Sequence, residues 1–200
     1  MRKSKVQRKT RETAISMELD LDGRGKYSIK SPIPFLDHML SLMCKHGLFD
    51  MNLRATGDVE VDYHHTVEDI GIVLGKALKQ SLGTMEGITR YGHASVPMDE
   101  ALASLSLDIS GRPYLAYRVT LPKKARIKDF DADLVEDFLQ AFTSHGGITL
   151  HVNVPYGRNI HHIIEAVFKG LGRALREAVS IDPRVTGLPA QRGDCEKTNA

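Results

Sequence analysis

The chain has 200 residues, with 27 Lys and Arg against 25 Asp and Glu, so its formal net charge is only +2 at pH 7. A charge this small does not require a nucleic acid as partner. No apolar run approaches the length of a membrane span, no secretory leader opens the sequence, and Cys44 and Cys195 form no paired motif. We therefore expect a cytoplasmic protein without disulfides, bound neither to a membrane nor to nucleic acid.

The first eleven residues carry six cations, which we interpret as a solvated tail leading into a strand rather than a nucleic-acid arm, because no aromatic residues are interleaved. The sequence then predicts two strands between 13 and 29, a helix over 35–46, one or two strands between 48 and 61, and a helix from 64 to about 82. After a connection it predicts strands at 94–97, 104–109 and 114–121, a helix over 131–143, a strand over 148–154, and a last helix ending near 179.

Two histidine doublets are the most informative feature of the sequence. His64-His65 and His161-His162 each open a segment with apolar residues at helical spacing. A glutamate, Glu68 or Glu165, follows four residues after the first histidine of each doublet. Residues i and i+4 share one face of a helix, so each histidine–glutamate pair can bind one divalent cation. One such pair fits a solvated helix start equally well, but its repetition at matched positions favours a metal site.

The surroundings of the doublets also repeat. His38 lies 26 residues before His64, and Asp137 lies 24 residues before His161, each within a predicted helix; His46 and His145 follow these two residues eight positions later. The order of helix, strands and doublet helix is the same in both halves, which indicates an internal duplication. We expect an α+β fold, an internally duplicated two-layer α/β sandwich in which each half is a mixed β-sheet with two helices packed on one face. The first half with its N-terminal segment would span residues 1–92 and the second half with a substrate-binding tail residues 93–200, in one compact domain.

The two halves together offer eight candidate metal ligands. These are His38, His64, His65, Glu68, Asp137, His161, His162 and Glu165. Eight ligands suffice for two ions, but two halves lying side by side could hardly bring all eight to one point. Ligands from neighbouring subunits would solve this problem, which predicts a homo-oligomer.

Four cations stand apart from the histidines and suit a phosphate group on a small substrate. They are Arg90, Arg112, Lys169 and Arg192. A guanidinium group can donate two parallel hydrogen bonds to two oxygens of one phosphate. Each of the four, taken singly, fits a surface cation better; Arg112 and Arg192 are the better candidates because they lie in predicted loops.

The chain resembles the imidazoleglycerol-phosphate dehydratase family, the lyases of histidine biosynthesis, along nearly its whole length. The matching segments are Arg11–Thr13, Phe35–Leu40, His64–Gly71, Arg90–Gly92, Pro97–Ala101, Asp108–Tyr114, Thr149–His151, His161–Ala166 and Phe168–Lys169. They occur in the family's order, and together they are highly specific.

The resemblance implies a duplicated sandwich that assembles into a cubic homo-oligomer, a 24-mer, with two Mn²⁺ ions in each active site shared between subunits. It implies that seven of the eight residues named above are metal ligands; at the eighth, Asp137, the ligand is either a carboxylate or absent. It also implies contacts with the substrate, a phosphorylated imidazole, from Glu12, His38, His46, His64, Glu68, Arg90, Arg112, His161, Lys169, Gln191 and Arg192. Two positions depart from the family's pattern: Asp137 replaces a histidine, and Pro189-Ala190-Gln191-Arg192-Gly193 replaces a tail with Ser, Thr and Lys.

The reaction implied by the resemblance converts D-erythro-imidazoleglycerol phosphate to imidazole acetol phosphate and water. A proton must leave a side-chain carbon of the substrate that is not acidic by itself. Cations on the two ring nitrogens would stabilise an imidazolate and then a diazafulvene as hydroxide leaves. The first candidate for the proton-transferring carboxylate is Glu12 and the second is Glu165, because a metal ligand is the poorer base.

Two other functions use the same residues. A metal-dependent hydrolase would use an ion-bound water as nucleophile and would not need the phosphate-binding cations. A metal-storage assembly would need the doublets but neither Glu12 nor the arginines. Replacing Glu12 by Gln separates these readings, because it should change nothing measurable in a storage protein.

Overall fold

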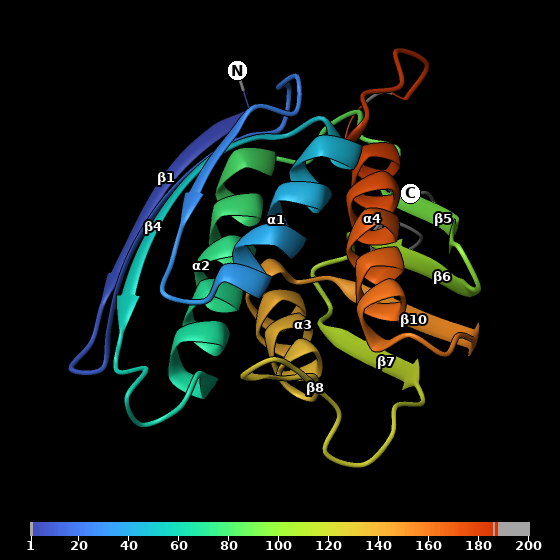
Figure 1. Ribbon diagram of the computed structural model, residues 1–200. Coiled ribbons are helices and arrows are strands. Elements are labelled where there is room, and N and C mark those ends of the chain that lie inside the picture. Colours follow the sequence, from blue (N-terminus) through green and yellow to red (C-terminus); the bar gives the residue numbers. More distant parts are fainter. Residues whose placement is uncertain (1, 186, 188–200) are drawn as a thin grey trace.

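The computed structural model describes residues 2–185 and Gly187, and it consists of two four-stranded sheets with four helices between them (Figure 1). The first sheet has the order β1-β2-β4-β3, from Lys3–Lys9, Thr13–Asp20, Asp50–Gly57 and Tyr27–Lys30. The second has the order β5-β6-β10-β7, from Tyr91–Met98, Ala101–Asp108, Thr149–Tyr156 and Tyr114–Val119. In each sheet one edge strand, β3 or β7, is parallel to its neighbour and the other pairings are antiparallel. Both sheets are therefore mixed and share one connectivity, as the duplication predicts.

The helices are α1 (Pro34–Gly47), α2 (His64–Leu82), α3 (Leu134–Gly146) and α4 (Ile160–Val179). α1 and α2 cover the inner face of the first sheet, and α3 and α4 cover that of the second. Between the sheets, α1 packs against α4 and α2 against α3, so every helix pair combines the two halves. One apolar core runs through both halves, and the predicted boundary at residues 92 and 93 falls inside β5. The predicted α+β sandwich is confirmed.

Glycines allow these helix pairs to approach closely. A Cβ added to Gly71 of α2 would lie 2.6 Å from the carbonyl oxygen of Phe138 in α3, and one added to Gly75 would lie equally close to that of Phe142. Real Cβ atoms do not approach backbone oxygens this closely. The backbones of α2 and α3 therefore sit nearer to each other than alanine would permit.

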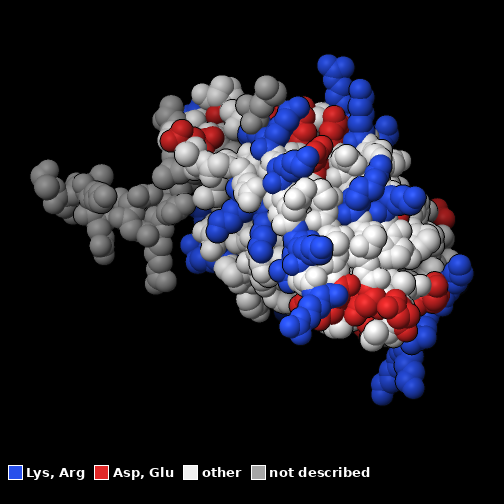
Figure 2. Space-filling model, turned by 90° about the vertical axis from the view of Figure 1, so that its left-hand side faces the viewer, with Lys and Arg blue, Asp and Glu red and all other residues white. Residues whose placement is uncertain are grey.

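The prediction for the N-terminal segment was wrong. Residues 3–9 are the edge strand β1 and not a solvated tail: Val6 is buried, while Lys3 and Lys5 form ion pairs with Asp20 (2.9 Å) and Glu18 (2.8 Å) of β2. Lysines on the outer face of an edge strand protect it from pairing with another chain, and Figure 2, which looks onto this face, shows Lys and Arg side chains spread across it.

The helix predicted from residue 131 begins at Leu134, because a two-stranded hairpin, β8 (Arg126–Ile127) and β9 (Phe130–Asp131), precedes it. The segment 48–61 contains the single strand β4. Among residues 2–185, no helix combines the length and apolar character that crossing a bilayer requires.

Candidate active site

Three predicted ligands from α1 and α4 meet at one point. His38, His161 and Glu165 each offer a ligand atom, and these atoms all lie within 4.8 Å of one another. The Oε2 atom of Glu165 is 3.2 Å from Nε2 of His161 and 3.9 Å from Nε2 of His38. The i, i+4 spacing thus places His161 and Glu165 side by side, and the packing of α1 on α4 adds a histidine from the other half of the chain.

Lys169 and a third histidine, His46, border this cluster. The Nζ atom of Lys169 is 2.6 Å from Oε1 of Glu165 and 3.2 Å from the Sδ atom of Met98. Burial pushes the pKa of Glu165 upward, but the hydrogen bond and charge of Lys169 outweigh it, and the pKa is lowered. The pKa of His46 is also lowered, first by burial and then by the positive charges of Lys169 and Arg173. His46 therefore lies beside the cluster and is disposed to stay neutral.

The first doublet meets α3 instead. Nδ1 of His64 lies 3.2 Å from Oδ2 of Asp137, so two predicted ligands from the two halves face each other. Glu68, one helical turn after His64, is exposed and forms no ion pair within the described part of the chain. His64 is thus in contact with Asp137 and not with Glu68, whereas His161 is in contact with the glutamate of its own helix.

The second histidine of each doublet is bound by a carboxylate that the sequence analysis did not single out. Nδ1 of His65 lies 3.0 Å from Oδ2 of Asp58, and Nδ1 of His162 lies 2.8 Å from Oε2 of Glu100. The pKa of each histidine is raised by its hydrogen bond to that carboxylate, and the pKa of Glu100 is lowered to about 2 by the bond from His162. A neutral imidazole held in this way donates from Nδ1 and presents the lone pair of Nε2, the arrangement of histidines that ligate metals.

The start of each doublet helix is held by a side chain two residues before the doublet's first histidine. Oδ1 of Asp62 accepts a hydrogen bond from the backbone N–H of His64 (2.8 Å), and Oδ1 of Asn159 accepts one from that of His161 (2.9 Å). Such bonds satisfy backbone donors that a helix start leaves free. They fix the direction in which each doublet leaves the first turn.

These donors fit a divalent cation. Imidazole nitrogens combined with carboxylate oxygens suit metals such as Mn²⁺, Fe²⁺ and Zn²⁺, and the imidazoles are oriented by carboxylates as ligating histidines are. The donors do not meet at one point in a single chain: His38, His161 and Glu165 form one group, and His64 with Asp137 forms another.

The two candidate bases lie with different doublets. Glu12 occupies the turn between β1 and β2, is exposed, and its charge adds to the rise in the pKa of His65. Glu165 belongs to the cluster of His38 and His161, where Lys169 binds it.

The predicted phosphate-binding cations do not all meet. Arg90 binds Asp108 through Nε (2.6 Å) and Nη2 (3.1 Å), and Arg112 lies 3.6 Å from the same carboxylate. Lys169 reaches Met98 at the far end of β5, so about eight residues of strand, roughly 25 Å, separate it from Arg90 within one chain. Gln191 and Arg192 lie outside the described residues.

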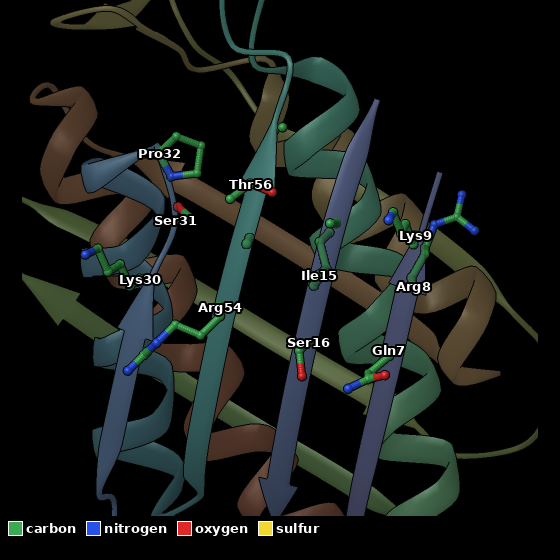
Figure 3. Close-up of a pocket in the computed structure, with 13 residues that line it drawn as sticks. Gln7, Arg8, Lys9, Ile15, Ser16, Lys30, Ser31, Pro32, Arg54 and Thr56 are labelled. Atoms are coloured by element: carbon green, nitrogen blue, oxygen red, sulfur yellow. The ribbon is translucent and has the colours of Figure 1, made fainter. Parts of the chain in front are cut away.

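One hollow of the described chain lies away from the histidines. It has a volume of about 820 Å³ on the outer face of the first sheet, where Gln7, Ser16 and Arg54 point outward beside Lys9 and Lys30 (Figure 3). Its lining includes neither histidine nor carboxylate. It therefore offers neither an imidazole nor a carboxylate for binding a metal ion.

The sequence of this chain matches known proteins along almost its entire length. Residues 31–175 match the profile of a family described as imidazoleglycerol-phosphate dehydratase. A protein of that name from Pelobacter propionicus is 57% identical over 192 residues, which cover 96% of this chain and 98% of the relative. The chain belongs to the imidazoleglycerol-phosphate dehydratase family.

Further relatives and solved structures agree with this membership. The imidazoleglycerol-phosphate dehydratase of Clostridium botulinum is 57% identical over 95% of this chain and 96% of its own length. The crystal structure of the Staphylococcus aureus dehydratase superposes with a TM-score of 0.81 at 37% identity, covering 90% of this chain and 99% of that one. The Pyrococcus furiosus structure gives 0.78 at 39% identity, covering 92% and 100%.

Membership in the imidazoleglycerol-phosphate dehydratase family confirms the predicted enzyme class, a lyase of histidine biosynthesis. Two carboxylates that the sequence analysis did not propose as site residues, Glu100 and Asp108, lie in segments that match the family. The sequence could therefore have indicated them as candidates. Their contacts with His162 and Arg90 depend on the tertiary fold.

Proposed function

We propose that this chain dehydrates D-erythro-imidazoleglycerol phosphate to imidazole acetol phosphate, using two Mn²⁺ ions in each active site. The observation that carries the proposal is the combination of 57% identity to a named dehydratase over nearly the whole chain with histidine–carboxylate groups at the starts of α2 and α4. A storage protein would not need the arginine pair at Asp108, which suits an anionic substrate.

The substrate's imidazole ring would bind at the helix starts. His38, His161 and Glu165 are arranged to hold one ion, and His64 with Asp137 contributes to the second. Two divalent ions bound there would stabilise the negative charge that develops on the ring as the proton leaves. The Nε2 atoms of His65 and His162 complete the donor set, since their Nδ1 atoms are already bonded to Asp58 and Glu100.

Glu12 is the favoured proton acceptor. Glu165 carries a lowered pKa and binds Lys169 through a 2.6 Å ion pair, which makes it a weak base. Glu12 is exposed on a turn and forms no ion pair with any described residue. A carboxylate in that position can take the proton from the second side-chain carbon, which becomes the carbonyl of the product, while the hydroxyl on the carbon next to the ring leaves as water.

The phosphate would bind to cations of more than one subunit. Arg90 and Arg112 share Asp108 at one end of the second sheet, whereas Lys169 lies at the other end of β5. Neighbouring copies in a 24-subunit cytoplasmic assembly could bring these two groups together, with the tail near Gln191 and Arg192. The same arrangement would supply the ligands that one chain leaves apart.

Steady-state assays with imidazoleglycerol phosphate test this proposal, together with metal analysis and light scattering. We expect turnover that requires Mn²⁺, about two ions per chain, and smaller particles after chelation that reassemble when Mn²⁺ returns. A protein that binds metal and assembles but shows no turnover would support the storage hypothesis. Hydrolysis of a phosphate ester without dehydration would support the hydrolase hypothesis.

A further inference from the structure

A buried polar network ties the turn that carries Glu12 to helix α2. Asp69 of α2 is only 5% exposed, and both of its carboxylate oxygens are bonded to the hairpin of β1 and β2. Oδ1 accepts from Nε of Arg8 at 2.8 Å, and Oδ2 accepts from the hydroxyl of Thr13 at 2.5 Å. We call Arg8, Thr13 and Asp69 the clasp.

The clasp holds both ends of a very short turn. Arg8 is near the end of β1 and Thr13 is the first residue of β2, so only residues 9–12 lie between them. Inside the turn, the hydroxyl of Thr10 accepts hydrogen bonds from the backbone N–H groups of Glu12 (3.1 Å) and Thr13 (2.9 Å). The backbone of Glu12 is therefore fixed relative to Asp69, which lies one helical turn after His65.

The second half of the chain has no such network. Strand register pairs Lys9 with Ala14 in the first hairpin and Pro97 with Leu102 in the second, so Arg8 and Thr13 correspond to Val96 and Ala101. Alignment of the doublets makes Ala166 the counterpart of Asp69. The second-half counterparts of the three clasp residues are thus all apolar, and all are buried.

The acid in the turn is used differently as well. Glu100 is the counterpart of Glu12 in the same alignment, and its side chain is bonded to His162 and to the backbone N–H of Asn159 (2.7 Å). In the first half Asp58 takes the corresponding place at His65. The carboxylate of Glu12 is consequently not bonded to the doublet, and the turn that carries it is attached to α2 through Asp69 instead.

We propose that the clasp is a positioning device that sets Glu12 for proton transfer. Where the turn acid is bonded directly to its histidine, as in the second half, apolar residues suffice beneath the turn. In the first half the carboxylate of Glu12 must stay available to the substrate, so it cannot be bonded to a histidine. The turn is held instead by the clasp of Arg8, Thr13 and Asp69. This inference rests on the proposed dehydratase reaction and on the role of Glu12 in it.

The chain itself supplies the variant that tests the proposal. Replacing the clasp by its second-half counterparts, Arg8→Val with Thr13→Ala and Asp69→Ala, removes all three polar groups together and leaves no unpaired charge. Apolar replacement of a complete buried ion pair is often neutral for stability, whereas removing one partner is not. We expect an unchanged melting temperature within a few degrees, unchanged Mn²⁺ content, and kcat lower by roughly tenfold to a hundredfold.

A double-mutant cycle with Glu12→Gln separates positioning from general damage. In the Glu12→Gln background the clasp replacement should lower kcat less than twofold, since the group it positions is gone. As single changes, Thr13→Ser should keep kcat and Thr13→Val should lower it, because only serine keeps the hydroxyl on Asp69. Ser4→Ala is the matched control: it removes a bond from β1 to the carbonyl of Ala77 in α2, far from the turn, and should leave kcat unchanged.

The outcomes distinguish the inference from the function on which it rests. If the parent is active and the clasp replacement lowers kcat by the same factor with and without Glu12, or does not lower it at all, the positioning role is overturned. The dehydratase reaction then still stands. Equal kcat for Thr13→Ser and Thr13→Val overturns it too. A parent enzyme without dehydratase turnover, or full activity of Glu12→Gln, refutes the proposed reaction or the role of Glu12 directly.

Discussion

Replacing Gly71 by alanine should separate α2 from α3 and disturb the site that they share. A Cβ at this position would lie 2.6 Å from the carbonyl oxygen of Phe138, whereas ordinary contact begins at 3.4 Å, so the helices must open by about 0.8 Å. Phe138 directly follows Asp137, whose carboxylate is 3.2 Å from Nδ1 of His64. The same shift would stretch that separation toward 4 Å, beyond a hydrogen bond.

The expected loss of stability follows from two opposing effects. Overpacking a well-filled interface costs about 1–3 kcal/mol, and the better helix propensity of alanine returns up to about 1 kcal/mol. We therefore expect a net loss of about 1–2 kcal/mol in the free energy of unfolding, or a melting temperature lower by about 2–8 °C for a chain of this size.

The assay is urea unfolding of metal-free protein at one fixed concentration, with Mn²⁺ titration of the folded variant. Gly170→Ala in α4 is the matched control, because its Cβ would meet only the flexible end of the Leu105 side chain. The control should unfold at the parent's urea concentration or above it and bind Mn²⁺ normally. If Gly71→Ala is as stable as Gly170→Ala and binds Mn²⁺ as tightly, the close approach of α2 and α3 does not maintain the site.

Three further predictions concern single side chains. Asp137→Ala should lower the Mn²⁺ content and Asp137→His should keep or raise it, because the carboxylate faces His64; equal metal content in all three proteins would mean that position 137 does not coordinate. Arg112→Ala should raise KM for imidazoleglycerol phosphate about tenfold to a hundredfold with little change in kcat, as expected for a lost charge-assisted bond to phosphate; an unchanged KM would place the phosphate elsewhere. Burial raises the pKa of Cys44 to about 12 from 9.0, so the neutral thiol stabilises the fold below pH 9 and this contribution is lost as pH rises toward 12. In a Cys195→Ser variant at pH 8, a thiol reagent should therefore label Cys44 only after unfolding, and rapid labelling of the native protein would contradict this burial.

The sequence predicted the helices and the doublets well because these features are local. Apolar spacing defines α1, α2 and α4 to within a residue or two, and the i, i+4 rule anticipated the contact between His161 and Glu165. The repeated order of elements was enough to predict the two-sheet architecture. What local pattern could not supply was the choice of helix partners, which places His38 with α4 and Asp137 with α2.

The missed features are long-range pairings. Strand β1 contains only one buried apolar residue, Val6. Its other residues are polar or charged, so the sequence shows no alternation of apolar and polar residues and resembles a solvated segment. Asp58 and Glu100 stand in loops of acidic residues, where sequence alone does not indicate which carboxylate meets a histidine. Whether the phosphate-binding cations converge stays a prediction, because one chain holds them apart.

The pairing of α1 with α4 and of α2 with α3 bears on how this protein arose. A half-length ancestor with one sheet and two helices would have exposed a broad apolar helix layer, so it could have persisted only as a twofold dimer of identical chains. In such a dimer both turn acids would have had the same surroundings. Fusion of two such copies into one gene would have allowed the turns to diverge, so that one acid binds its histidine, as Glu100 binds His162, and the other, Glu12, does not.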